Sequence, residues 1–141
     1  MSNKRIQRVG VIGAGVMGSG IAAHLASAGI DVLLVDIVPR NAPAAAASDD
    51  PSYDHVRHAR NGIAAAGLAA AGKLKPAAFQ RRGDAARIQI GNLDDDMAAL
   101  GACDWVVEAV IERLDIKQSV FARLDAVRGE HDPAQGLAHG R

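Results

Sequence analysis

A glycine-rich turn near the N-terminus constrains the fold of this chain more than any other feature. It lies in the stretch "RVGVIGAGVMGSGIAAHLASAGIDVLLVDI", residues 8–37. The apolar run Val9–Ile12 stops at a glycine, as a buried parallel strand does, and a helical pattern begins at Gly15. A second apolar run, Val32–Val35, is closed by the acid Asp36. Strand, glycine turn, helix, strand and acid together predict the opening of a dinucleotide-binding unit.

The glycines of "GAGVMG" have separate roles in such a unit. Gly13 permits the tight turn, Gly15 removes the side chain that would block a pyrophosphate, and Gly18 lets the helix pack close to the strand. The diphosphate would rest on free N–H groups at the positive end of the helix. The cofactor-binding residues predicted in this loop are Gly13, Ala14, Gly15, Val16, Met17 and Gly18. Such a pattern alone is weak evidence, and a purely structural turn is the alternative, but the flanking strand, helix and acid all match the fingerprint.

Asp36 predicts which dinucleotide is bound. It follows Gly18 after 18 residues and should accept hydrogen bonds from the adenine ribose hydroxyls. Its charge would repel a 2′-phosphate, so the sequence favours NAD over NADP. The alternative is a solvated acid at a strand end. Arg40, four residues later, is interpreted as a solvated charge in a loop.

The remaining pattern alternates strands with helices. In the first helix, Met17, Ile21, Leu25 and Ala28 fall on one apolar stripe that ends at Gly29. The elements predicted beyond Asp36 are a loop over Pro39–Asp54, an Ala-rich helical stretch over 54–75, a short helix over Pro76–Arg82, a strand over Ile88–Ile90, a short helix in "DDDMAALGAC" with acids in its first turn, a strand over Trp105–Ala109 and a helix over Leu114–Arg128.

This order of elements predicts an α/β fold of the Rossmann type, a doubly wound parallel sheet with helices on both faces. About four strands are present where a complete fold of this kind shows about six, so we expect the sheet to be truncated before its last strands. Residues 1–128 are predicted to form an incomplete NAD-binding Rossmann domain. Residues 129–141, "GEHDPAQGLAHGR", are expected to be an irregular or disordered tail, without a strand.

Composition excludes several other classes of protein. The chain has 141 residues, which suits one domain, with zero formal net charge and few aromatic residues, so no nucleic acid partner is expected. The single cysteine, Cys103, fits a reducing compartment, and no apolar run is long enough for a membrane span. The basic N-terminus is followed too early by glycines for a signal peptide, so a cytoplasmic location is expected. No metal site is predicted, because His55, His58, His131 and His139 lack a ligand spacing, and His24 is interpreted as a partly exposed helix residue. No nucleophile is predicted, because Cys103 has no candidate partner histidine.

A second segment points to a family. "CDWVVEAVIERLDIKQSVFARLDAV", Cys103 to Val127, taken with the glycine stretch, resembles the NAD-binding domain of the 3-hydroxyacyl-CoA dehydrogenases. The resemblance covers the glycine loop, the second strand and the fourth strand with its helix well, and the middle loosely. It implies an oxidoreductase that carries out the third step of fatty-acid β-oxidation with NAD as cofactor.

The resemblance also implies roles for residues outside the glycine loop. Glu112 and Lys117 match the family's acid and lysine on the nicotinamide ribose side of NAD, although Glu112 also suits a helix first turn. Lys73 stands where the family places a lysine near the coenzyme A phosphates, and a solvated lysine is the alternative. Ala66 stands where compact members offer a hydroxyl to coenzyme A. Apart from the resemblance, Glu108 lies in an apolar strand run; because strand residues alternate faces, it could face the cofactor or simply end its strand.

The catalytic half of the family pattern is not found in this sequence. As hydride leaves the carbon that bears the 3-hydroxyl, a general base must take the hydroxyl proton. In the family this base is a histidine in an "HFFNP" segment, accompanied by an "SNTS" segment, and neither segment occurs here. No catalytic residue is therefore predicted, and we expect no unaided dehydrogenase activity. A truncation or frame change after Arg128 is one hypothesis, and a separately encoded second half is the other. Acyl-CoA binding is expected only in a complete chain, and the exposed edge of the fourth strand suggests a homo-oligomer or a complementing C-terminal half.

Two other functions remain open from the residues. One is a stand-alone NAD-binding or regulatory module without catalysis. The other is a different dehydrogenase with a "GxGxMG" loop, of the β-hydroxyacid type. Members of that group that prefer NADP usually carry a basic pair in place of Asp36, and they lack "VVEAVIERLDIK".

Overall fold

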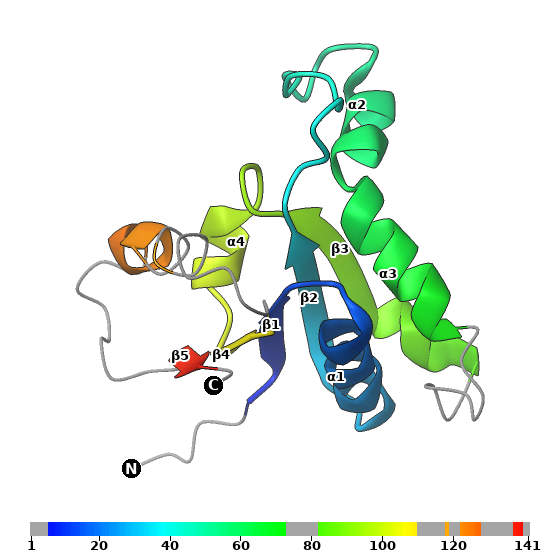
Figure 1. The fold of residues 1–141 in the computed structure, drawn as a ribbon, viewed down its shortest axis with the longest axis vertical. Coiled ribbons are helices and arrows are strands. Elements are labelled where there is room, and N and C mark those ends of the chain that lie inside the picture. The colour runs from blue at the N-terminus through cyan, green and yellow to red at the C-terminus, as the bar shows by residue number, and fades with distance from the viewer. Residues whose placement is uncertain (1–5, 73–81, 110–117, 119–121, 128–136, 140–141) are drawn as a thin grey trace.

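A parallel β-sheet forms the centre of the molecule in the computed structural model, which describes residues 6–72, 82–109, 118, 122–127 and 137–139. The strands are β1 (Arg8–Ile12), β2 (Asp31–Asp36), β3 (Ile88–Asn92), β4 (Trp105–Glu108) and β5 (Leu137–His139). Their order across the sheet is β3-β2-β1-β4-β5, and every neighbouring pair is parallel. All carboxyl ends therefore meet at one edge of the sheet, at the top of β2 and β3 in Figure 1.

Helices cover both faces of this sheet. They are α1 (Val16–Ser27), α2 (Tyr53–Arg60), α3 (Gly62–Gly72) and α4 (Met97–Gly101), with a 3-10 helix, η1 (Arg82–Arg87), before β3. Residues 118 and 122–127 are also helical. Helices α1 and α3 lie on one side of the sheet, and α4 and helical residues 122–127 lie on the other (Figure 1). The predicted doubly wound α/β fold is confirmed.

The alternation of side chains along the strands produces two hydrophobic cores. In β2, Leu33 and Val35 face α4, whereas Val32 and Leu34 face α1 and α3. All four side chains are almost completely buried. A strand that is covered on both faces must be apolar at consecutive positions, which is why "VLLV" forms a continuous run.

Helix α1 buries a different face from the one predicted. Met17 is 56% exposed, and Ile21 and Leu25 are only partly buried. The buried residues of the helix are small: Gly18, Ser19, Ala22, Ala23 and Ala26. The helix lies so close to the sheet that large side chains do not fit between them, so the larger residues pack at its margins. The predicted stripe is therefore wrong at Met17 and at Ala28, which is exposed beyond the helix end.

Two further predictions are corrected. The acids of "DDDMAALGAC" do not occupy the first turn of a helix, because α4 begins at Met97 and the acids form the turn before it. Strand β5 pairs with β4 through Leu137–His139, so the expectation of a wholly irregular tail and of an uncovered fourth strand is wrong at these residues. The domain boundary at residue 128 stays a prediction. The predicted helix Pro76–Arg82 lies outside the described residues except for its last position. Positions 114–117, 119–121 and 128 of the predicted helix Leu114–Arg128 also lie outside them.

Candidate functional site

The glycine loop joins β1 to α1 at the carboxyl edge of the sheet. Gly13 has a φ of 104°, a conformation that favours glycine, and its N–H donates to the Val35 carbonyl at 2.8 Å. A Cβ atom at Gly18 would overlap the Gly13 carbonyl oxygen, so α1 can approach β1 only with glycine there. At Gly15, in contrast, an added Cβ would meet nothing within 4 Å. The structural roles predicted for Gly13 and Gly18 are confirmed, and Gly15 faces open space where a ligand could approach.

The start of α1 is open and suits an anion. Gly15 is the N-cap and provides no side-chain hydrogen bond to the helix. The first-turn amides of a helix have no carbonyl partner within the helix, and they lie at its positive end. Val16 is 85% exposed and Met17 is 56% exposed, so neither side chain packs in the core. These features fit a diphosphate on the N-terminus of α1, as the sequence predicted.

Asp36 lies beside this loop. Its Oδ2 accepts a hydrogen bond from the Ala14 N–H at 2.7 Å, and its Oδ1 accepts one from the Ile37 N–H at 2.7 Å. The residue is partly buried at the end of β2. A carboxylate has about four lone-pair sites, so two backbone donors leave capacity for ribose hydroxyls. The structure thus brings Asp36 and the glycine loop together, as the sequence predicted, while their contact with a cofactor stays a prediction.

An apolar pocket of about 340 Å³ lies between the glycine loop and α3. A Cβ at Gly67 would overlap the Ala14 carbonyl oxygen and come within 2.8 Å of the Ala14 Cβ, so α3 packs directly on the loop. Ser19 supports the same contact, because its hydroxyl donates to the Ala14 carbonyl at 2.8 Å. The pocket is lined by Ala14, Gly15, Val16, Ser19, Ile63, Ala66, Gly67, Ala70 and Ala71.

Of the residues singled out beyond the glycine loop and Asp36, the structure describes some and not others. Lys73, Glu112 and Lys117 lie outside the described residues. Glu108 is 2% exposed at the end of β4, where it pairs in register with Ile12, the last residue of β1. It therefore ends its strand as a buried acid next to the start of the glycine loop.

A polar cluster at the carboxyl end of β3 was not predicted. Arg60 binds Asp95 through Nε at 2.8 Å and Nη2 at 2.9 Å, and Arg57 binds Asp96 at 3.0 Å. Asn92, which is 1% exposed, donates to Asp95 at 2.9 Å. The paired arginine holds the pKa of Asp95 below its ordinary value, mainly through the Arg60 hydrogen bond and against the opposing effect of burial. We call Arg57, Arg60, Asn92, Asp95 and Asp96 the arginine–aspartate cluster.

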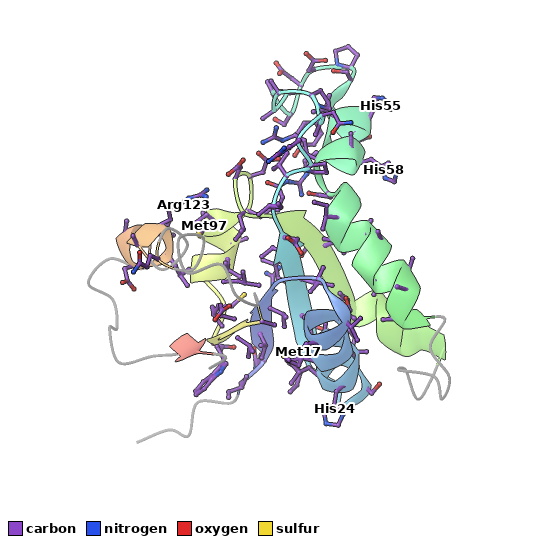
Figure 2. All side chains as sticks on the ribbon, viewed as in Figure 1. Met17, His24, His55, His58, Met97 and Arg123 are labelled. Carbon is purple, nitrogen blue, oxygen red and sulfur yellow. The ribbon has the colours of Figure 1, made fainter. Side chains whose placement is uncertain are left out.

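The histidines of α1 and α2 lie away from the site. His24 points outward from α1, and His55 and His58 point outward from α2 (Figure 2), and all three are exposed. Cys103 is 2% exposed and belongs to the core on the α4 side. Within the described part of the chain, no group of three or more His, Cys, Asp or Glu residues is arranged to hold a metal ion. No helix in that same part is long and apolar enough to cross a membrane.

The sheet order, the glycine loop at the start of α1 and the acid at the end of β2 define a nucleotide-binding domain of the Rossmann type. The family model described as "3-hydroxyacyl-CoA dehydrogenase, NAD binding domain" matches residues 8–132. The chain belongs to this family, and the cofactor of the family is NAD. The predicted resemblance is confirmed.

Individual relatives agree with this assignment. The chain is 45% identical over 123 residues to a "Probable 3-hydroxyacyl-CoA dehydrogenase" of Deinococcus radiodurans, covering 87% of this chain and 31% of the relative. It is 39% identical over 126 residues to a protein of the same name from Bacillus subtilis, covering 89% of this chain and 16% of that one. The crystal structure of M. tuberculosis FadB2 is similar with a TM-score of 0.59 and 30% identity, over 98% of this chain and 42% of that one. The chain thus spans less than half the length of these relatives.

Proposed function

We propose that this chain provides the NAD-binding half of a 3-hydroxyacyl-CoA dehydrogenase in fatty-acid β-oxidation. In that reaction, hydride passes between the 3-hydroxyl carbon of an acyl-CoA and NAD. The main support is the position of the Asp36 carboxylate, whose Oδ2 lies 2.7 Å from the Ala14 amide nitrogen of the glycine loop, at the carboxyl edge of the sheet. That arrangement unites the features that recognise the ribose and the diphosphate in one place.

Each residue of the loop and strand end has a role in this proposal. The amides of the first turn of α1 bind the diphosphate, and Gly15 leaves room for it. Asp36 accepts hydrogen bonds from the adenine ribose hydroxyls and disfavours a 2′-phosphate. When bound, NAD supplies the ring that accepts hydride; the protein residues described here bind and orient the cofactor and take no proton in the reaction.

Other parts of the proposal rest on the family resemblance. Glu112 and Lys117 are assigned to the nicotinamide ribose side, and Lys73 to the coenzyme A phosphates. The general base that the reaction needs is assigned to no residue of this sequence, because no "HFFNP"-like segment occurs in it. Acyl-CoA binding and dimer formation, or pairing with a complementing C-terminal half, are assigned to a complete assembly. A cytoplasmic location is part of the same proposal.

The test is a titration of the chain with NAD and with NADP. We expect NAD to bind more tightly, and Asp36→Ala to weaken NAD at least about tenfold, since a lost hydrogen bond to a charged group costs about 1.5–3 kcal/mol. NADP should lose less, because Asp36 repels its 2′-phosphate. Asp31→Ala, a substitution of an exposed acid at the opposite, amino end of β2, is the control and should change neither affinity. A preference for NADP, or equal losses for both dinucleotides, would contradict the role of Asp36.

A further inference from the structure

The arginine–aspartate cluster connects three segments that are distant in sequence. Arg60, at the end of α2, donates two hydrogen bonds to the Asp95 carboxylate, and its Nη1 donates to the Pro43 carbonyl at 2.9 Å. Its side chain is only 11% exposed. One guanidinium therefore joins α2, the turn after β3 and the loop that follows β2. This loop runs from Ile37 to Ser52, and in Figure 1 it passes above the carboxyl ends of β2 and β3.

Asn92 fixes the cluster to the strand end. Its Oδ1 accepts hydrogen bonds from the Asp94 and Asp95 N–H groups at 3.0 and 2.7 Å, which closes the turn after β3. Its Nδ2 donates to the Asn61 Oδ1 at 2.7 Å, in addition to Asp95. Every polar atom of this buried amide side chain is thus engaged, and the turn has little freedom to move.

The cluster borders the position of Asp36. Asn92 is the register partner of Asp36 across the β2–β3 pair, and the Leu93 N–H donates to the Asp36 carbonyl at 3.0 Å. On the other side, the Pro39 ring lies 3.6 Å from the position of a Cβ at Gly62, where α3 begins. Pro39 follows Asp36 by three residues, so the start of the loop lies beside the first residue of α3, and Arg60 bonds the loop at the Pro43 carbonyl.

The geometry of the sheet indicates what this loop faces. Successive sites along the carboxyl edge are the glycine loop after β1, Asp36 at the end of β2 and Asn92 at the end of β3. A dinucleotide with its diphosphate at the first and its ribose at the second extends its adenine toward the third. Ile37, directly after Asp36, is 45% exposed and offers an apolar surface at this point.

We propose that Arg60 is a positioning residue for the adenine end of the cofactor, acting through the loop after β2. Its bonds to Asp95 and to the Pro43 carbonyl hold the loop in the conformation that contacts the base, so that binding need not order it. Arginine suits this role because its planar group bonds the carboxylate at two points and reaches the carbonyl at the same time. This inference rests on the proposed function, since it assumes that a dinucleotide occupies the edge of the sheet.

The experiment is calorimetric titration with ADP and with NAD, at a temperature well below the unfolding of every variant. We expect Arg60→Gln to raise the Kd for ADP about 5–10-fold, the scale of ordering a side chain or loop on binding, and Arg60→Lys to recover part of that loss. Arg87→Gln is the matched control, because Arg87, directly before β3, pairs with Asp31 at 3.4 Å at the opposite, amino end of the β2–β3 pair. It should leave ADP affinity within twofold of the original chain. Hydrogen exchange should show ADP protecting residues 37–50 in the original chain and less so in Arg60→Gln.

The outcomes separate this inference from the function on which it rests. If the unmodified chain binds neither ADP nor NAD, both are overturned. If it binds them and Arg60→Gln has a lower Tm but unchanged ADP affinity and loop protection, the cluster only stabilises the fold and the inference alone is overturned. If Arg60→Gln does not fold, Asp95→Asn decides in the same way, because it removes the charged partner and keeps the guanidinium. A higher Kd for ADP in Asp95→Asn supports the proposal, and an unchanged Kd overturns it.

Discussion

Gly18 and Gly20 both lie in α1, yet their surroundings differ completely. A Cβ at Gly18 would overlap the backbone carbonyl oxygen of Gly13, whereas one at Gly20 would meet nothing within 4 Å. The carbonyl belongs to the glycine turn, where Gly13 has a positive φ, so it cannot move away without distorting the loop. One glycine is therefore required by packing, and the other is only a weak helix former.

This contrast predicts opposite effects of the same substitution. Gly18→Ala should destabilise the chain by about 1–3 kcal/mol or more, because overpacking against backbone forces a shift. It should also abolish NAD binding by displacing the loop. Gly20→Ala should stabilise the chain by about 0.5–1 kcal/mol, as expected for glycine replacement within a helix. Denaturant unfolding of both variants is the measurement, and equal stabilities would contradict the close packing of α1 on the loop.

At the residue scale, the sequence was most informative where the chemistry is local. The turn at Gly13, the close contact at Gly18 and the nearness of Asp36 all follow from a short motif between two strands. The apolar stripe predicted for the first helix does not mark its buried face at Met17, because a regular apolar period does not reveal how closely a helix approaches a sheet. Here the glycine loop sets that distance, and alanine and glycine occupy the interface.

At the scale of elements, the arginine–aspartate cluster could not be read from the sequence. Arg60 and Asp95 are 35 positions apart, and "DDD" before an apolar run is typical of a helix start. Only the register of β3 beside β2, together with the packing of α2 above them, brings the charges together. Such pairs depend on tertiary contacts that local patterning does not specify.

The cluster predicts a stability that depends on pH. Because Arg60 lowers the pKa of folded Asp95, this carboxylate contributes fully at pH values above its ordinary pKa of about 3.9. The contribution is lost as the pH falls through the lowered value. Asp95→Asn should therefore cost about 1–3 kcal/mol at pH 7, and its difference from the original chain should shrink at pH values below about 4.

Urea unfolding from pH 7 to pH 3 measures this effect. Asp49→Asn, at an exposed position in the loop after β2, is the control and should track the original chain at every pH. A difference between Asp95→Asn and the original chain that stays constant down to pH 3 would show that Asp95 is not held ionised by Arg60.

At the scale of the whole molecule, the type of fold was predictable from the sequence, but the strand β5 at the edge of the sheet was not. Alternating strands and helices with both faces of β2 buried allow few arrangements other than a doubly wound parallel sheet. Strand β5 has only three residues, and its segment, "LAH", has no run of apolar residues to mark it. It pairs with the edge of β4, and no pattern in its sequence predicts that pairing.

Because the glycine loop, Asp36 and the arginine–aspartate cluster share one edge of the sheet, a ligand that bridges them should stabilise the molecule as a unit. A ligand that binds only the folded state adds RT ln(1 + [L]/Kd), which is about 2.7 kcal/mol at a free concentration of 100 Kd. NAD should therefore raise the Tm by several degrees, whereas an equal concentration of NADP should raise it less. The NAD shift should shrink in Asp36→Ala while Asp31→Ala retains it, since Asp36 bonds the glycine loop and Asp31 lies at the opposite, amino end of β2. A shift of equal size with both dinucleotides would mean that binding is dominated by the diphosphate at the start of α1 and that Asp36 does not discriminate.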